Sequence, residues 1–356
     1  MYAIICRKLT LALLAAGALF GSALLPAATA QAATANPAAA TAQWQKSLAG
    51  TTEQGEGCYQ ASYPSLSWHS VGCVAAPEIP FAPALKPGTS AHTGVETVGD
   101  GTDYSAVVSG LISKATGTFT NVSSGITEKG AVDGSGSQVS NSFSLQLNSQ
   151  FFTGSSACSA SKVPADCDAW QQFVYTFNGG STGEIFMQYW LIDYNATCPS
   201  GWYTYSTDCY TNSSATEVSA VTAAQLATVN LTATAVSGGN DAVSLSIGSG
   251  TAVTVTGKDT KVGLAAAWNT AEWGVYGDGG GSAANFGSSS TLEAQTALTD
   301  SAGSGAPSCV KEGFTGETNN LTLTATPALG TATSPTMGTK QTNGTTSTAS
   351  CATVAG

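Results

Sequence analysis

The chain has 356 residues and a formal net charge of −11, and only 9% of its residues are charged, compared with roughly 25% in an ordinary soluble protein. Its 11 lysines and arginines form no basic patch that would neutralise nucleic-acid phosphates, so we expect no nucleic-acid partner. The small number of titratable groups also limits the change in net charge when the pH falls, which suits a protein in acidic surroundings.

The first 30 residues predict a secretory signal peptide. Arg7 and Lys8 precede the apolar run "LTLALLAAGALFGSALL", and small-residue "ATA" sites follow at 28–30 and 33–35. A retained membrane anchor is the alternative, but these cleavage sites and the lack of a second apolar span favour export. We therefore expect a secreted, extracellular protein with no membrane association after the signal peptide is removed.

Residues 31–95 predict a linker or pro-segment. They contain one cysteine loop, "GCYQASYPSLSWHSVGC", followed by the proline-rich stretch "APEIPFAPALKPG". Proline restricts its own backbone and that of the preceding residue to extended conformations, so this stretch is expected to lie extended.

Residues 96–305 predict a β-sandwich domain. Short runs such as "NSFSLQLNSQFF" and "EIFMQYWLIDY" alternate with a period of two and are bounded by Gly, Ser, Asn and Asp. This pattern is typical of an all-β jelly roll made of two antiparallel sheets. "TAAQLATV" and "KVGLAAAWNTAEW" are the two places where a short helix fits. Residues 306–356 are rich in Thr, Ser and Gly and predict a tail that is tethered to the sandwich by a disulfide.

The cysteine count predicts disulfides. Of nine cysteines, Cys6 leaves with the signal peptide, and an even number in a secreted chain favours disulfides over a thiol nucleophile. Sequence alone leaves the connectivity open, and pairing between chain neighbours is the simplest expectation: Cys58 with Cys73, Cys158 with Cys167, Cys198 with Cys209, and Cys309 with Cys351. No spacing is C-x-x-C, and His69 and His92 lie far from any such cluster, so no metal or other cofactor is expected.

Several catalytic classes are excluded by missing motifs. There is no G-x-S-x-G elbow, and both histidines precede the sandwich, which argues against a Ser-His-Asp triad. The stretch "GDGGG" (277–281) follows a predicted strand but lacks the Lys-Ser/Thr of a phosphate-binding loop, so we interpret it as a flexible loop over the site. Carboxylate and carboxamide chemistry remains.

Four segments between about residues 100 and 300 carry a resemblance. In chain order they are "DYSAVVSG…KATGTFTNV", "AWQQFVYTF", "EIFMQYWLIDY" and "TAEWGVYGDGGGSAANFGSSSTLEAQTALTD". Their order and spacing are similar to those of the glutamic peptidases (eqolisins), which are secreted acid endopeptidases with a concanavalin A-like β-sandwich. The chain thus resembles a divergent member of this family, and a polypeptide is the substrate that the resemblance implies.

The resemblance implies a catalytic Glu/Gln dyad. Glu272 in "TAEW" matches the glutamate that activates a water molecule, and Gln172 in "AWQQFVY" matches the glutamine that stabilises the oxyanion. Gln171 and Gln172 point to opposite faces of one strand, so only one of them can take this role. Gln172 should share its face with Trp170 and Val174.

We also expect four residues to line the substrate groove: Trp170, Gln188, Trp190 and Trp273. The chain also departs from the family, because Phe173 and Val174 replace its Thr-Gly after the glutamine. This favours one alternative, a non-catalytic sandwich that binds carbohydrate or another surface ligand. A further alternative is a glycosidase that pairs Glu272 with Glu184 or Asp193, which requires two carboxyls about 5–10 Å apart. We expect a monomer.

Overall fold

The structure is a computed structural model that describes residues 37–48, 51, 55–84, 97–248, 250–300, 305–346 and 349–351. The predicted signal peptide and residues 85–96, which include His92, lie outside the described residues. In the part of the chain that is described, no helix is long and apolar enough to cross a membrane.

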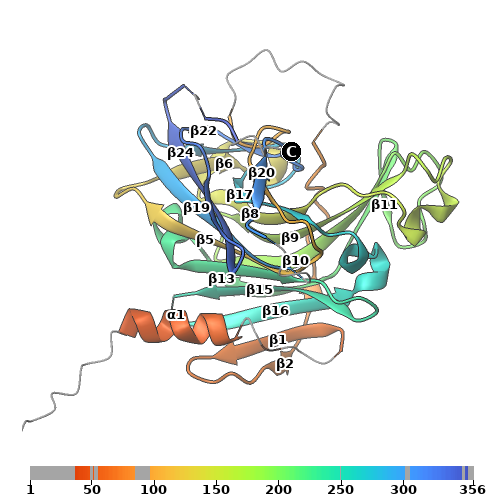
Figure 1. Cartoon of the computed structure of the whole chain (residues 1–356), viewed down its shortest axis with the longest axis horizontal. Helices are drawn as coiled ribbons and strands as arrows, with labels where there is room; N and C mark the ends of the chain where they lie inside the picture. The colour runs from red at the N-terminus through yellow and green to blue at the C-terminus, as the bar shows by residue number, and fades with distance from the viewer. Residues whose placement is uncertain are drawn as a thin grey trace, which may run out of the picture. The chain divides into compact units, whose positions relative to one another are not determined.

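Two large antiparallel sheets form a sandwich, which confirms the predicted fold class (Figure 1). The first sheet has the order β2 (His69–Val71), β1 (Gly57–Ser62), β16 (Thr251–Lys258), β15 (Asn240–Ile247), β14 (Val229–Thr234), β5 (Ile112–Val122), β19 (Thr291–Asp300), β24 (Ser334–Asn343) and β22 (Leu321–Leu323), and β23 (Ala328–Thr331) also pairs with β24.

The second sheet carries the candidate site. Its order is β11 (Tyr203–Tyr205), β12 (Asp208–Asn212), β10 (Thr182–Ile192), β9 (Asp168–Asn178), β8 (Ser142–Ser149), β17 (Thr270–Tyr276), β4 (Ser105–Val107) and β20 (Ser308–Val310), and β13 (Ser214–Ser219) joins β10 to β3 (Val74–Ala75). A small third sheet has the order β21 (Thr318–Asn319), β18 (Ala283–Phe286), β6 (Glu128–Ala131) and β7 (Gln138–Ser140).

In the described ranges, helical structure is limited to short elements. Helix α1 (Pro37–Leu48) packs Trp44 and Leu48 against the first sheet. The two segments with helical potential form short 3₁₀ turns instead, and β14 and β17 begin within a few residues of these turns. The 3₁₀ turns are η1 (Val132–Gly134), η2 (Ser156–Ala160), η3 (Ala223–Thr228), η4 (Asp259–Lys261) and η5 (Leu264–Ala266).

The two sheets enclose the main hydrophobic core. Strand β9 is buried on both faces, and its residues alternate between the two sides as a period of two requires. Phe173 and Tyr175 point into the core between the sheets. Gln171 points the same way, and its Nε2 donates to Asp241 Oδ2 of β15 at 3.0 Å, which joins the two sheets. The other face of β9 is covered by the chain segments described below.

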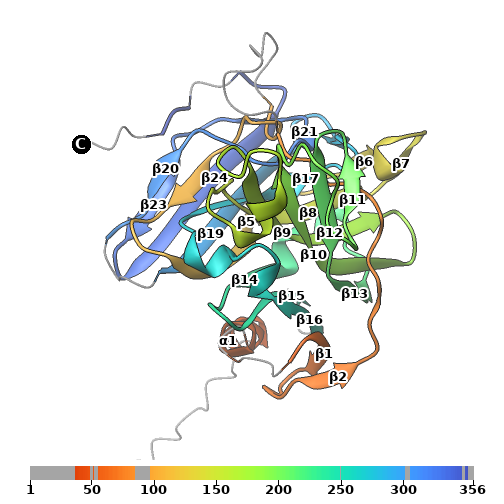
Figure 2. The same cartoon turned by 90° about the vertical axis from the view of Figure 1, so that its right-hand side faces the viewer.

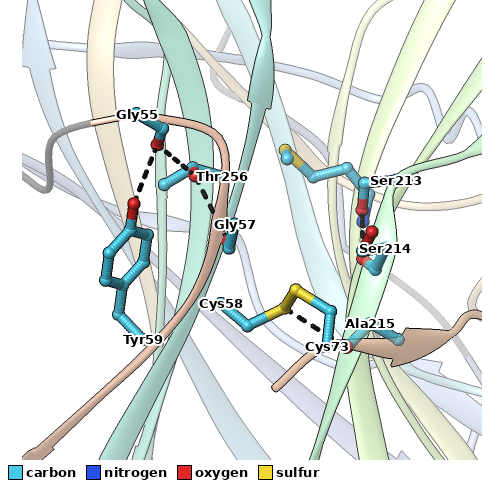
Figure 3. The surroundings of a disulfide bond; sticks show 10 residues. Gly55, Gly57, Cys58, Tyr59, Cys73, Ser213, Ser214, Ala215 and Thr256 are labelled. Carbon is cyan, nitrogen blue, oxygen red and sulfur yellow. Dashed lines mark hydrogen bonds between the residues drawn. A yellow bond between two sulfur atoms is a disulfide. The ribbon is translucent and has the colours of Figure 1, made fainter. Parts of the chain in front are cut away.

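All four predicted disulfide pairings are confirmed: Cys58–Cys73, Cys158–Cys167, Cys198–Cys209 and Cys309–Cys351. Figure 3 shows the first of these beside Ala215 of β13. Because Cys58 lies on β1 and Cys73 directly precedes β3, this disulfide joins a strand of the first sheet to a segment that runs on to the second.

Segments on both sides of residues 96–305 take part in the sheets. The predicted linker or pro-segment contains β1, which pairs with β16 through six residues, and β3, which pairs with β13. The predicted tethered tail contains β24, which pairs with β19 from Thr336 to Thr342. These pairings join residues far apart in the sequence.

Candidate functional site

One row of polar residues crosses five neighbouring strands of the second sheet. In register, Glu272 lies opposite Asn148, Asn148 opposite Gln172, Gln172 opposite Gln188, and Gln188 opposite Asn212. Residues that lie opposite each other in a sheet point to the same face. The predicted dyad therefore shares a face, and two strand spacings, about 10 Å, separate the two backbones.

Aromatic residues form the neighbouring row on the same face. Trp170 lies opposite Trp190, Trp190 opposite Tyr210, and Tyr210 opposite Tyr203. The rings of Trp190 and Tyr210 stack with centroids 5.0 Å apart, and those of Tyr210 and Tyr203 stack at 5.1 Å. Trp170 and Trp190 thus lie beside the polar row, and Gln188 is a member of it, so these three predicted groove residues share one face of the sheet.

Trp273 does not lie on this face, so its assignment to the groove is wrong. It follows Glu272 directly on β17, and successive side chains on a strand point to opposite faces. Its ring packs in the core, 5.2 Å from the ring of Phe119, and its Nε1 donates to Thr118 O. The Ala-Glu-Trp segment therefore supplies one site residue and one core residue.

Glu272 is fully buried and asymmetrically bonded. Its Oε2 accepts hydrogen bonds from Asn148 Nδ2 at 2.8 Å, from the Phe314 amide at 3.1 Å and from the Thr315 amide at 3.3 Å. Its Oε1 is buried and makes no hydrogen bond of good geometry among the described residues, although the nearby Tyr276 hydroxyl interacts with this carboxyl. A carboxyl oxygen without a well-formed hydrogen bond is free to accept a proton from, or return one to, a molecule brought beside it.

Asp103 is a second carboxyl at this end of the row. Tyr276, which shares a face with Glu272 on β17, donates its hydroxyl to Asp103 Oδ2 at 2.5 Å. Burial raises the pKa of Glu272 to about 8, and the nearby Asp103 contributes to this rise. Burial likewise raises the pKa of Asp103 to about 7. Covering the site therefore favours the protonated form of Glu272.

Gln172 is connected to Glu272 through two other amides. Gln172 Nε2 donates to Gln146 Oε1 at 3.1 Å, and the same oxygen accepts from Asn148 Nδ2 at 3.2 Å. Gln172 Oε1 accepts from Trp190 Nε1 at 3.1 Å. Gln172 shares its face with Trp170 and Val174, whereas Gln171 faces the core.

Two chain segments cover this face of the sheet. We call residues 77–84 the N-terminal strap and residues 312–317 the C-terminal strap. They run antiparallel to each other: the Ala84 amide donates to Phe314 O at 2.8 Å, and the Gly316 amide donates to Ala82 O at 2.7 Å. The C-terminal strap covers Glu272, whose Oε2 accepts two of its amides. Neither Glu272 nor Gln172 has any exposed surface.

The C-terminal strap adds a third buried carboxyl. Glu317 Oε1 accepts from the Ala82 and Gly281 amides, both at 3.1 Å, and its Oε2 accepts from Thr315 Oγ1 and Gln146 Nε2. Burial raises the pKa of Glu317 to about 7. Glu317 therefore links both straps to the side-chain amide of Gln146 on β8.

Sequence reasoning missed Asp103, Tyr276, Glu317, Gln146 and Asn148. The last two left a detectable signal, since "SLQLNS" places amides at alternate positions of a strand whose other residues are apolar. The carboxyls of Asp103 and Glu317 lie in segments without a motif.

The glycosidase alternative does not fit the geometry. Strands β10 and β17 are three strand spacings apart, about 14 Å, and Glu184 lies four residues along β10 from the polar row, so it is about 20 Å from Glu272. Asp193, beyond the other end of β10, is also too far. Within the described ranges no group of three or more His, Cys, Asp or Glu residues is placed to hold a metal ion.

No family model, curated protein or solved structure matches this chain. The chemistry of the site must therefore be argued from its own residues. They provide a carboxyl with one free oxygen, an amide two strands away, and a row of side chains that donate and accept hydrogen bonds. Such a face suits a ligand rich in peptide groups.

Proposed function

We propose that the protein is a secreted acid endopeptidase in a covered, inactive state. The observation that supports this is the common row of Glu272 and Gln172, with a free carboxyl oxygen on Glu272. A polypeptide that lies across the row between these side chains would place a scissile carbonyl within reach of both.

The reaction assigns one role to each side chain. Ionised Glu272 removes a proton from a water molecule, and the water oxygen attacks the carbonyl carbon. Gln172 Nε2 donates a hydrogen bond to the oxyanion of the tetrahedral intermediate. Glu272 then returns its proton to the amide nitrogen as the C–N bond breaks, which releases an amine and a carboxylic acid.

The straps must move before this reaction can start. Glu272 is a base only when it is ionised, and burial keeps its pKa raised. Removing the straps would hydrate the carboxyl and return its pKa toward the ordinary value of 4.5. An uncovered Glu272 would then be ionised in mildly acidic solution.

The test is cleavage of a denatured protein between pH 2 and 7 by the purified chain, before and after limited proteolysis. We expect cleavage in mildly acidic solution, where an uncovered Glu272 is ionised. Glu272→Gln should abolish it, and Gln172→Ala should reduce it by about 100- to 1,000-fold. Glu184→Gln is the matched control, because it makes the same chemical change far from the row, and should keep full activity. Absence of cleavage at every pH would leave the alternative, a non-catalytic binding sandwich.

A further inference from the structure

The N-terminal strap lies against the polar row in the way that a bound peptide would. Three consecutive strap carbonyls accept hydrogen bonds from side chains of the sheet: Pro77 O from Asn212 Nδ2 at 2.8 Å, Glu78 O from the Tyr210 hydroxyl at 3.2 Å, and Ile79 O from Gln188 Nε2 at 2.9 Å. Figure 2 shows this orange segment rising from β2 past β13.

The next residues of the strap are held in the same way. The Phe81 amide donates to Gln188 Oε1 at 2.7 Å, and Pro80 O accepts from the Gly280 amide at 2.8 Å. The Gln188 side chain thus donates one hydrogen bond to the strap main chain and accepts another from it. Except for the hydrogen bond from the Tyr203 hydroxyl to the exposed Glu78 carboxylate, every polar contact named here is made to main-chain atoms. Such recognition depends little on sequence and suits extended polypeptides in general.

One strap side chain fills a specific pocket. Phe81 has no exposed surface and packs against Val174, Phe186 and Ala215, with its ring centroid 5.9 Å from that of Phe186. The glycine-rich loop forms another side of this pocket: an added Cβ at Gly279 would lie 3.5 Å from Phe81 Cζ. The "GDGGG" stretch is therefore a loop that accommodates the strap.

The strap has the composition of a segment that stays extended. Pro77, Pro80 and Pro83 recur every third residue, and proline fixes φ near the value of an extended chain and has no amide hydrogen that needs a partner. Its upstream end is fixed by the Cys58–Cys73 disulfide and by the pairing of β3 with β13.

We infer that this face is a binding groove for the main chain of an extended polypeptide, with a pocket that selects an aromatic side chain, and that the N-terminal strap is its built-in occupant. The inference names the substrate class of the proposed peptidase and rests on that proposal only for hydrolysis. The contacts of the strap support binding without that proposal.

The test empties the groove and offers it a peptide. In a chain that carries Glu272→Gln, so that nothing bound can be cleaved, Phe81→Glu places a carboxylate in the apolar pocket and should displace the strap. Hydrogen exchange of residues 77–84 measures the displacement. Fluorescence anisotropy then measures binding of a labelled synthetic peptide, APEIPFAPAL, and of the same peptide with alanine in place of its phenylalanine.

We expect faster exchange in the strap, and binding of the phenylalanine peptide about 10- to 100-fold tighter than that of the alanine peptide. Val139→Glu, at an exposed position on β7, is the control and should change neither measurement. If Phe81→Glu does not fold, Phe81→Ala takes its place with the same measurements.

Two results would overturn the inference: unchanged exchange of the strap, or equal affinity for the two peptides. These outcomes are separate from the peptidase test, because the Glu272→Gln background does not turn over. Selective peptide binding, with no cleavage by the wild-type chain at any pH even after limited proteolysis, would reject the peptidase and keep the groove.

Discussion

Replacing Gly279 with alanine should loosen the N-terminal strap, and replacing Gly281 should not. Both glycines have left-handed backbones, with φ of +71° and +70°. An alanine at either position therefore carries the same conformational cost, about 1 kcal/mol. The two variants differ only in what the new methyl group contacts.

At Gly279 the added Cβ would lie 2.5 Å from Ile79 Cγ2, well inside the roughly 3.5–4.0 Å at which carbon atoms attract each other. At Gly281 no heavy atom lies within 4 Å of the added Cβ. Overpacking of this kind costs about 1–3 kcal/mol, and moving the strap away from the loop relieves it. Gly279→Ala should thus weaken the attachment of the strap by about 1–3 kcal/mol more than Gly281→Ala does.

Hydrogen exchange of residues 77–84 is the direct assay. We expect Gly279→Ala to speed exchange by about 5- to 150-fold relative to Gly281→Ala, which corresponds to 1–3 kcal/mol. Urea unfolding of both variants shows how much of the loss is global. Equal exchange in the two variants would refute the claim that the glycine-rich loop accommodates the strap.

Three further predictions concern stability. Burial raises the pKa of Asp278 from 3.8 to about 6, so between these values the folded protein keeps a proton that the unfolded chain has lost. The protonated form contributes about 3 kcal/mol to stability below pH 4, and this contribution is lost as the pH rises through 6. Thermal melting should therefore show a higher midpoint at pH 4 than at pH 8. Gln171→Ala removes the side-chain donor to buried Asp241 and should cost about 1–3 kcal/mol in urea unfolding; an unchanged midpoint would contradict the link between the sheets. Replacing Cys58 and Cys73 with serine opens a loop of 15 residues and should lower the free energy of unfolding by about 3 kcal/mol, measured by thermal unfolding. Because the variant lacks this disulfide, a reductant should have no further effect at this site.

Strand periodicity was enough to predict the sandwich and the direction of the central side chains. The run "AWQQFVYTF" assigned Gln172 to the face of Trp170 and Val174, and the structure places all three there because a strand alternates strictly. The same rule, applied to the residue after Glu272, would have assigned Trp273 to the core. That error came from treating a tryptophan beside a carboxylate as a groove residue.

The position of the N-terminal strap over the sheet could not be predicted, because its hydrogen-bond partners are distant in the sequence. The prolines of residues 77–84 correctly predicted an extended chain, but its hydrogen bonds go to Gln188, Asn212, Gly280 and Glu317, and no local pattern identifies such partners. β1 likewise depends on β16, nearly 200 residues away. Long-range pairing of short strands leaves little trace in composition or periodicity.

The covering of Glu272 connects the groove with the chemistry proposed for it. The Phe314 and Thr315 amides of the C-terminal strap donate hydrogen bonds to Glu272 Oε2, which lowers the pKa of Glu272. Burial under the same strap raises that pKa by more. The free Oε1 is the atom that would carry the proton. Displacing the straps would therefore open the groove and ionise Glu272 in one movement, so that the base would form only when a polypeptide can reach it.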